Sequence, residues 1–176
     1  MRVIGGEFRS RLLKSLPGLD VRPTPDRLRE ALFNVLAPRI EGTVFADIYA
    51  GTGAVGIEAL SRGAAGAVFV EQNRAAVRVI RENLRALGLD ARADVRQGQA
   101  ASLLPGIDAD IVFLDPPYRL EREYETWRPP ASVRLLIVQH AARFKTAESY
   151  GALRRSRILK QGDNALSFYA PATDFQ

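Results

Sequence analysis

The sequence has no cysteine and a single histidine, His140, among its 176 residues. Disulfide bonds are therefore excluded, and one imidazole without thiolates cannot build a zinc site, so we expect no metal. No apolar run approaches the roughly 20 residues that a membrane helix needs, and the first residues lack the apolar core of a signal peptide. We therefore expect a cytoplasmic protein that does not contact a membrane. At this length a single compact domain with a short appendage is the natural organisation.

Positive charge lies on two flanks of the sequence. Residues 1–40 carry eight Lys/Arg against four Asp/Glu, residues 119–160 carry ten against four, and residues 41–118 carry seven against ten. This distribution favours a neutral or cationic ligand held centrally and a polyanion bound by the flanks. Solvated arginines that merely keep a protein soluble give the same counts, so charge alone leaves that alternative open.

The alternation of apolar segments predicts the fold. Residues 2–16, around the turn-forming pair Gly5-Gly6, predict a small β-hairpin, and Thr24 and Pro25 predict the N-cap and first residue of a helix. We expect residues 1–40 to form an extension and residues 41–176 the main domain. In the main domain, expected strands alternate with expected helices, which predicts a mostly parallel, Rossmann-like α/β sheet. The strands are expected at 44–48, 67–70, 90–96, 109–114 and 133–138, the helices at 54–62 and 74–87, and a C-terminal antiparallel hairpin at 152–159 and 165–170.

A glycine-rich loop follows the expected strand at 44–48. Gly51, Gly53 and Gly56 form a G-x-G-x-x-G pattern, and Glu71 follows Gly51 by 20 residues at the end of the next strand. Glycines let the backbone approach a ligand, and a carboxylate at that strand end can accept hydrogen bonds from ribose hydroxyls. The pattern therefore predicts an adenosine-containing cofactor, with a surface acid as the alternative for Glu71.

Asp47, four residues before the first glycine of the loop, favours one cofactor over another. The glycine pattern is also the fingerprint of NAD-binding proteins, but the Asp47 carboxylate would repel the pyrophosphate of a dinucleotide. The same carboxylate is favourable beside the ammonium group of S-adenosylmethionine, directly or through a water molecule. Asp47 can also cap amides of the glycine loop, and the two roles are compatible.

The tetrapeptide Asp115-Pro116-Pro117-Tyr118 follows the expected strand at 109–114. Ligands of open α/β sheets bind beyond the carboxyl ends of strands, so this turn should face the cofactor. An sp² amine is a poor nucleophile, and two acceptors, the Asp115 carboxylate and the Pro116 carbonyl, can hold its hydrogens and aim its lone pair at a methyl group. Consecutive prolines stiffen the turn, and Tyr118 offers a face for an unstacked base. Taken alone, the tetrapeptide is also compatible with an ordinary proline turn.

The two motifs together resemble amino-methyltransferases with a (D/N/S)-P-P-(Y/F) signature. More narrowly, the stretches RVIGGEFRSR from Arg2, RPTPDRLREALFNVL from Arg22 and GIEALSRGA from Gly56 resemble the RsmD family. The resemblance implies a class I methyltransferase with a seven-stranded sheet and one antiparallel strand in its C-terminal hairpin. It also implies S-adenosylmethionine as cofactor, and methylation of the N2 amine of a guanine in small-subunit (16S) ribosomal RNA. Naked RNA or the assembled subunit would be the partner, residues 1–40 would cover RNA and cofactor, and we expect a monomer.

The expected site combines these motifs with the resemblance. Its catalytic set is Asp115, Pro116, Pro117 and Tyr118. The expected RNA contacts, which position a phosphate backbone, are Arg9, Arg11, Lys14, Arg22 and Arg29, although solvent-facing charge is the alternative for each. The expected cofactor contacts are Thr24, Arg27, Asp47, Tyr49, Gly51, Gly53, Glu71, Gln72, Asn73, Gln99, Ala100 and Asp115.

The sequence departs from the family pattern at two places. Residues 119–130 are short, charged and end in two prolines where the family has an amphipathic helix, so we expect one sheet face to be poorly covered. Trp127 in this segment could fill that gap or stack on a base. Gln99 stands where related enzymes often have Asp or Asn against the adenine amine, and its side-chain carbonyl can still accept that hydrogen bond.

Three other functions remain open from the sequence. N6-adenine methylation of DNA or RNA, and methylation of a protein glutamine amide, use the same chemistry, but those enzymes more often carry Asn or Ser in place of Asp115. A cofactor-sensing RNA-binding module or assembly factor without turnover is the third, and the missing helix after Tyr118 makes it plausible.

Overall fold

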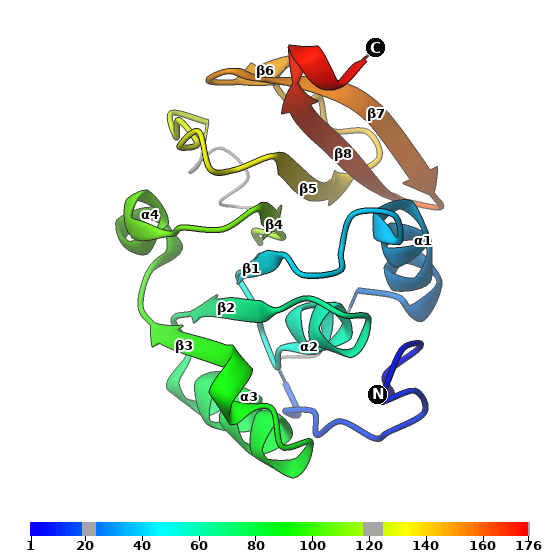
Figure 1. The fold of residues 1–176 in the computed structure, drawn as a ribbon, viewed down its shortest axis with the longest axis vertical. Helices are drawn as coiled ribbons and strands as arrows, with labels where there is room; N and C mark the ends of the chain where they lie inside the picture. Colours follow the sequence, from blue (N-terminus) through cyan, green and yellow to red (C-terminus); the bar gives the residue numbers. More distant parts are fainter. Residues whose placement is uncertain (19–23, 118–124, 176) are drawn as a thin grey trace.

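The computed structural model describes residues 1–18, 24–117 and 125–175 (Figure 1). Its strands form one sheet of order β3-β2-β1-β4-β5-β8-β7-β6. Strands β1 to β5 are parallel, and β8 pairs antiparallel with both β5 and β7. The strands are β1 (Val44–Ile48), β2 (Gly66–Glu71), β3 (Ala93–Gln97), β4 (Ile111–Leu114), β5 (Leu135–Ala141), β6 (Ser149–Tyr150), β7 (Leu153–Gln161) and β8 (Asn164–Pro171).

The expected parallel sheet with a C-terminal antiparallel hairpin is confirmed. Among the described residues the sheet has eight strands instead of seven, because the two-residue strand β6 is added at the edge of β7. The β7–β8 hairpin turns at Gly162, whose φ of 60° lies in the left-handed region that a tight turn needs. The hairpin therefore completes the sheet beyond β5, as the sequence predicts.

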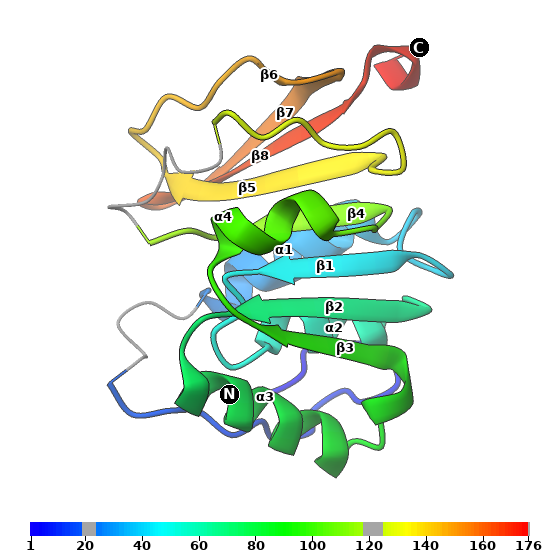
Figure 2. The same cartoon turned by 90° about the vertical axis from the view of Figure 1, so that its left-hand side faces the viewer.

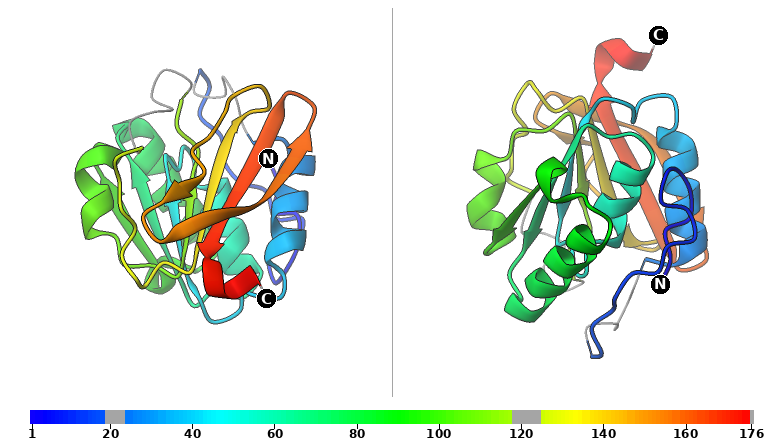
Figure 3. Two further views of the ribbon diagram at one scale, coloured as in Figure 1. Left: turned by 90° about the horizontal axis from the view of Figure 1, so that it is seen from above. Right: turned by 60° about the horizontal axis from the view of Figure 1, so that its bottom comes forward.

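Of the helices in the described residues, three cover one face of the sheet and a single short one lies on the other (Figures 1 and 3). Helix α3 shows the reason, because its apolar residues Val77, Ile80 and Leu84 recur at helical spacing and are buried. Short 3₁₀ turns at Asp90–Arg92, Leu104–Gly106 and Ala172–Phe175 complete the described chain. The covering helices are α1 (Asp26–Leu36), α2 (Ala54–Ser61) and α3 (Arg74–Ala86), and the helix of the opposite face is α4 (Ala100–Leu103).

The face opposite α1, α2 and α3 is also covered by the chain that precedes β5. Residues 125–134 contain no helix, yet Trp127 and Val133 are buried in one apolar cluster with Val112, Leu136 and Tyr169 of the sheet. The expectation of a poorly covered face is therefore wrong for the residues that the structure describes. Of its two expected roles, Trp127 fills the gap, and its side chain is 9% exposed.

Because Trp127 is the only tryptophan of the sequence, its fluorescence reports on this face directly. We expect a blue-shifted emission that acrylamide quenches weakly and that shifts to the red only on unfolding in urea. Addition of RNA should leave the emission unchanged. A red-shifted emission in the folded protein, or strong quenching by RNA, would show that Trp127 is exposed or stacks on a base.

The N-terminal segment is less regular than the sequence predicts. An antiparallel bridge joins Arg2 to Leu12, and the Val3 N–H donates to the Arg11 carbonyl at 3.0 Å, so the expected hairpin is reduced to a short pairing without regular strands. Thr24 does not cap α1, because the N-cap is Pro25 and makes no side-chain bond to the helix. Instead, the Thr24 hydroxyl donates to the Gln139 side-chain oxygen at 3.2 Å, which ties the start of α1 to the end of β5.

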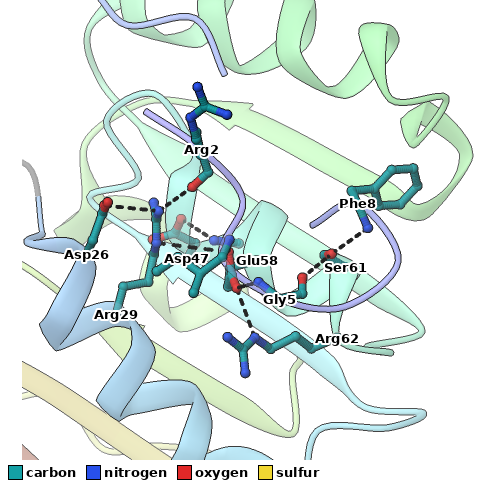
Figure 4. A network of polar contacts seen from close by, with 11 residues as sticks. Arg2, Gly5, Phe8, Asp26, Arg29, Asp47, Glu58, Ser61 and Arg62 are labelled. Carbon is teal, nitrogen blue, oxygen red and sulfur yellow. Dashed lines mark hydrogen bonds and ion pairs between the residues drawn. The ribbon is translucent and has the colours of Figure 1, made fainter. Parts of the chain in front are cut away.

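A buried carboxylate on α2 holds the N-terminal segment in place (Figure 4). The Glu58 side chain is wholly buried and accepts hydrogen bonds from the backbone N–H groups of Ile4 and Gly5, each at 2.9 Å. It also accepts from Arg62 Nε at 2.9 Å. Glu58 therefore satisfies three donors, and it also forms an ion pair with Arg29, whose Nε lies 4.0 Å from Glu58 Oε2 and has no hydrogen-bond partner among the described residues.

Arg29 is fully buried beside Glu58, and its Nη2 donates to the backbone oxygen of Arg2 and to Asp26. Burial lowers the pKa of Arg29, and the charges of Glu58 and Asp26 oppose that effect. A side chain without exposed surface cannot contact RNA, so the prediction that Arg29 binds RNA is wrong. The local sequence does not show this burial, because the partner Glu58 is distant in sequence.

Candidate active site at the ends of β1 and β4

The carboxyl ends of β1 and β4 lie side by side at the centre of the sheet. The chain runs from β1 outward through β2 to β3, and then returns to β4 on the other side of β1. Ligands of open α/β sheets bind at this kind of switch point. Because Ile48 pairs with Leu114, the glycine loop after β1 and the Asp115 turn after β4 leave the sheet next to each other. The Asp115 N–H also donates to the Ile48 carbonyl at 3.4 Å.

The glycine loop has an unusual backbone and an open side. Tyr49, Gly51 and Gly53 have φ angles of 63°, 59° and 86°, all in the left-handed region. That conformation is uncommon for a residue with a bulky side chain such as Tyr49, and strained residues concentrate at functional sites. A Cβ atom added at Gly51 would meet no atom within 4 Å. The loop therefore offers its backbone to open space, as a cofactor cradle requires.

Glu71, at the end of β2, is hydrogen-bonded to this loop (Figure 2 shows the adjacent strands β1 and β2). Its Oε2 accepts from the Gly51 N–H at 2.8 Å, and its Oε1 accepts from the Asn73 N–H at 3.0 Å. Each carboxylate oxygen keeps a further lone pair with which it can accept from a ribose hydroxyl. Asn73 is the N-cap of α3, since its side chain accepts from the Ala75 and Ala76 N–H groups. Glu71 is thus part of the loop, not an isolated surface acid.

Asp47 is a buried carboxyl group below the loop, with an exposed fraction of 1%. Its Oδ2 accepts from the Gly56 N–H at 2.9 Å, so it caps an amide at the start of α2. Burial raises the pKa of Asp47 well above its usual range, and the charges of Asp115 and Glu71 raise it further, while the Gly56 hydrogen bond acts in the opposite direction. Three carboxyl groups therefore converge on the region, which favours a ligand that carries positive charge.

Replacing Asp47 by Asn should stabilise the protein at neutral and alkaline pH. When folding raises the pKa of a carboxyl group above its ordinary value of 3.8, the protein loses stability as the pH rises from about 3.8 toward the pKa of the folded state. Asparagine carries no charge, and its side-chain oxygen can still accept from Gly56. We expect Asp47→Asn to match the wild-type melting temperature at about pH 3.5 and to exceed it at pH 8, whereas its affinity for S-adenosylmethionine falls. An equal difference at both pH values would contradict this account.

The structure brings some of the other predicted residues to the same edge. Gln99 is exposed and immediately precedes α4, Ala100 is its buried first residue, and Gln72 is exposed after β2. The nearby Gly98 N–H donates to the Glu71 carbonyl at 3.1 Å, which ties this segment to the cofactor loop. Pro116 is buried and Pro117 is exposed. The predicted residues Arg22 and Tyr118 lie outside the described residues, and Arg27 is exposed on α1.

Two polar residues at the end of β5 were not predicted as part of this region. Gln139 is 3% exposed and accepts from Thr24. His140 lies within β5, where its Nε2 and the Ser167 hydroxyl are 2.8 Å apart and its Nδ1 lies 2.8 Å from the Ala141 carbonyl oxygen. Burial lowers the pKa of His140, which favours a neutral ring with Nδ1 as donor. His140 is therefore a buried structural residue, consistent with leaving it out of the catalytic set.

No group of three or more His, Cys, Asp or Glu side chains in residues 1–18, 24–117 and 125–175 is placed to hold a metal ion. Over the same part of the chain, no helix has the length and apolar character to cross a membrane.

Several known proteins are similar to this chain in sequence and in fold. The model of the family described as conserved hypothetical protein 95 matches residues 1–170. Ribosomal RNA small subunit methyltransferase D of Escherichia coli K12 is 46% identical over 121 residues, which are 68% of this chain and 61% of that protein. YlbH of Bacillus subtilis 168 is 31% identical over 96% of this chain and 98% of its own length. The solved structure of Escherichia coli yhhF, 34% identical, has a TM-score of 0.81 and covers 97% of each chain. The chain therefore belongs to the conserved hypothetical protein 95 family, that of the RsmD-type methyltransferases.

Proposed function

We propose that this protein transfers a methyl group from S-adenosylmethionine to the N2 amine of a guanine in small-subunit ribosomal RNA. The observation that carries the proposal is the juxtaposition of the Asp115-Pro116 turn and the glycine loop at adjacent ends of β4 and β1. The name of the Escherichia coli relative supports the ribosomal substrate. The preference for guanine N2 rests on Asp115 in the first position of the tetrapeptide and on the resemblance to the RsmD family.

The residues at the strand ends fit S-adenosylmethionine. The open backbone at Gly51 leaves room for the cofactor, and Glu71 has lone pairs for the ribose hydroxyls. Asp47 would face the positive charge of the cofactor, and that charge would stabilise the ionised carboxylate that burial disfavours. When bound, the cofactor supplies a methyl group activated by a positively charged sulfur. Tyr49, Gln72, Gln99 and Ala100 would complete the contacts from the neighbouring strand ends.

Asp115 and Pro116 would orient the amine. The Asp115 carboxylate and the Pro116 carbonyl each accept one hydrogen of the amino group, which leaves the nitrogen lone pair directed at the methyl group. The new N–C bond forms as the C–S bond breaks, and the proton on nitrogen leaves to Asp115 or to water. Pro116 is buried, so its carbonyl is held in place at little entropic cost on binding. Tyr118 would support the base after it leaves its stack.

Analysis of the methylated nucleoside tests this proposal. Ribosomal RNA from a strain that lacks the gene is digested after incubation with the purified protein and S-adenosylmethionine, and the nucleosides are separated by mass and retention. We expect N2-methylguanosine in RNA of the small subunit. N6-methyladenosine would overturn the guanine assignment in favour of the adenine alternative, and methylation confined to a protein glutamine would overturn the RNA substrate altogether.

A further inference from the structure

Four arginines form one exposed stripe along α3. Arg74, Arg78, Arg81 and Arg85 are spaced by four, three and four residues, which places them on a single face of the helix. With a rise of 1.5 Å per residue the stripe is roughly 16 Å long. All four side chains belong to exposed residues, and no ion pair or hydrogen bond joins any of their guanidinium groups to another described residue.

Glu82, the one acid of α3, offsets only part of the charge of this stripe, because it interacts with Arg78 and Arg85 but pairs with Lys14. Glu82 is paired with Lys14 of the N-terminal segment at 3.0 Å, and this contact holds the pKa of Glu82 below its usual value. Like charges at this spacing on a helix repel one another and destabilise the helix. Solubility does not require that four arginines share one face. The stripe therefore presents a concentrated positive charge in a segment whose overall count of charged residues is acidic.

A groove runs beside the stripe, between α3 and the edge strand β3. An open depression of about 670 Å³ is lined by the four arginines, by Ala75 and Glu82 of the same helix, and by Gln97 at the end of β3. A second depression of about 200 Å³ continues it along β3, and Arg81 and Arg85 line both. Its floor includes the apolar residues Leu84 and Val95. The arginines thus border a continuous hollow at the edge of the sheet.

The stripe connects the cofactor edge with the N-terminal basic residues. Arg74 begins α3 only three residues after Glu71, which binds the glycine loop. At the other end, Arg11 Nη2 donates to the carbonyl of Ala86 at 3.5 Å, and the Lys14 backbone N–H donates to the Asn83 side chain at 2.8 Å. In Figure 2 the N-terminal segment correspondingly runs beside α3. A chain of positive charge therefore extends away from the candidate active site.

We propose that the stripe of Arg74, Arg78, Arg81 and Arg85 binds the phosphate backbone of the RNA that flanks the target base. Guanidinium groups pair with phosphate oxygens, and such contacts position a nucleic acid without reading its sequence. Arg11, which contacts the end of α3, extends the same track. This inference rests on the proposed function for the identity of the polyanion. The four arginines belong to residues 41–118, where acidic residues outnumber basic ones.

The test compares two double variants that each remove two positive charges. Arg78→Gln with Arg81→Gln alters the stripe and preserves helix propensity. Arg39→Gln with Arg134→Gln alters exposed arginines outside the stripe, one after α1 and one before β5, where Arg134 pairs with Asp174 at 3.3 Å. Affinity for a fluorescent fragment of small-subunit ribosomal RNA is measured by anisotropy at several salt concentrations, with cofactor affinity and melting temperature measured alongside.

We expect the stripe variant to bind RNA roughly tenfold more weakly, with the slope of log K against log salt reduced by about 1.5 to 2. Its cofactor affinity should be unchanged, and the control variant should bind RNA within about twofold of wild type. Equal RNA affinity and equal salt slope for wild type and the stripe variant would overturn the inference. A stripe-dependent RNA complex in which no methyl group is transferred would support the RNA surface and refute the proposed reaction, so the two failures are distinguishable.

Discussion

Replacement of Asp115 by Ala is expected to lower the rate of methyl transfer by roughly 10² to 10³-fold, the effect of removing one preorganised group from a polar transition-state site. The amine then loses one of the two acceptors that orient its lone pair, while the glycine loop and Glu71 remain. S-adenosylmethionine should therefore bind nearly as tightly as to wild type. Single-turnover rates measure the first effect and calorimetry the second.

Two variants make the Asp115 prediction specific. Asp115→Asn keeps one acceptor oxygen and should lose less activity than Asp115→Ala. Asp108→Ala removes an exposed carboxylate from the loop before β4, at the opposite end of that strand, and should leave the rate unchanged. Near-normal turnover by Asp115→Ala would show that the turn after β4 is not the site of catalysis.

Replacement of Glu58 by Ala is expected to reduce the free energy of unfolding by roughly 3–5 kcal/mol, the usual cost of leaving a buried charge without its partner. Arg29 is then a fully buried cation without the Glu58 carboxylate, and the N–H groups of Ile4 and Gly5 lose their acceptor. A loss of this size is a large fraction of the stability of a domain. The midpoint of urea unfolding at pH 7 measures it.

The controls for Glu58 separate charge from hydrogen bonding. Glu58→Gln keeps one acceptor oxygen but no charge, so its midpoint should lie between those of wild type and Glu58→Ala. Glu82→Ala removes the partner of Lys14 in an exposed pair, and its midpoint should stay close to that of wild type because exposed pairs are screened by solvent. An unchanged midpoint for Glu58→Ala would mean that the buried network does not hold the N-terminal segment.

The sheet was predictable where a strand is mostly apolar and a turn follows it directly. Strand β1 has the expected bounds, Val44–Ile48, because a parallel strand is buried on both faces and turns follow at once. Strand β5 was expected at 133–138 but spans Leu135–Ala141. Its polar residues Gln139 and His140 are buried because β8 pairs with them and Ser167 bonds to the imidazole ring. That pairing joins segments far apart in sequence, and a local pattern does not contain it.

The candidate site was predictable where the chemistry depends on spacing along the chain. Gly51 and Glu71 are 20 positions apart, and the Gly51 N–H donates directly to the Glu71 carboxylate at 2.8 Å. By contrast, the burial of Arg29 depends on Glu58, which belongs to another helix. A charge total does not show the arginine stripe of α3, because ten Asp/Glu outnumber seven Lys/Arg over residues 41–118 and only the helix places four of these arginines on one face.

The most direct test of the central claim is the transfer of tritiated methyl groups from labelled S-adenosylmethionine into ribosomal subunits from a strain that lacks the gene. We expect label in the RNA of the small subunit, none in the large subunit, and almost none when the protein carries Asp115→Ala. A protein that binds the cofactor and the small subunit but transfers no label to its RNA would contradict the account, and would identify the chain as a binding or assembly factor.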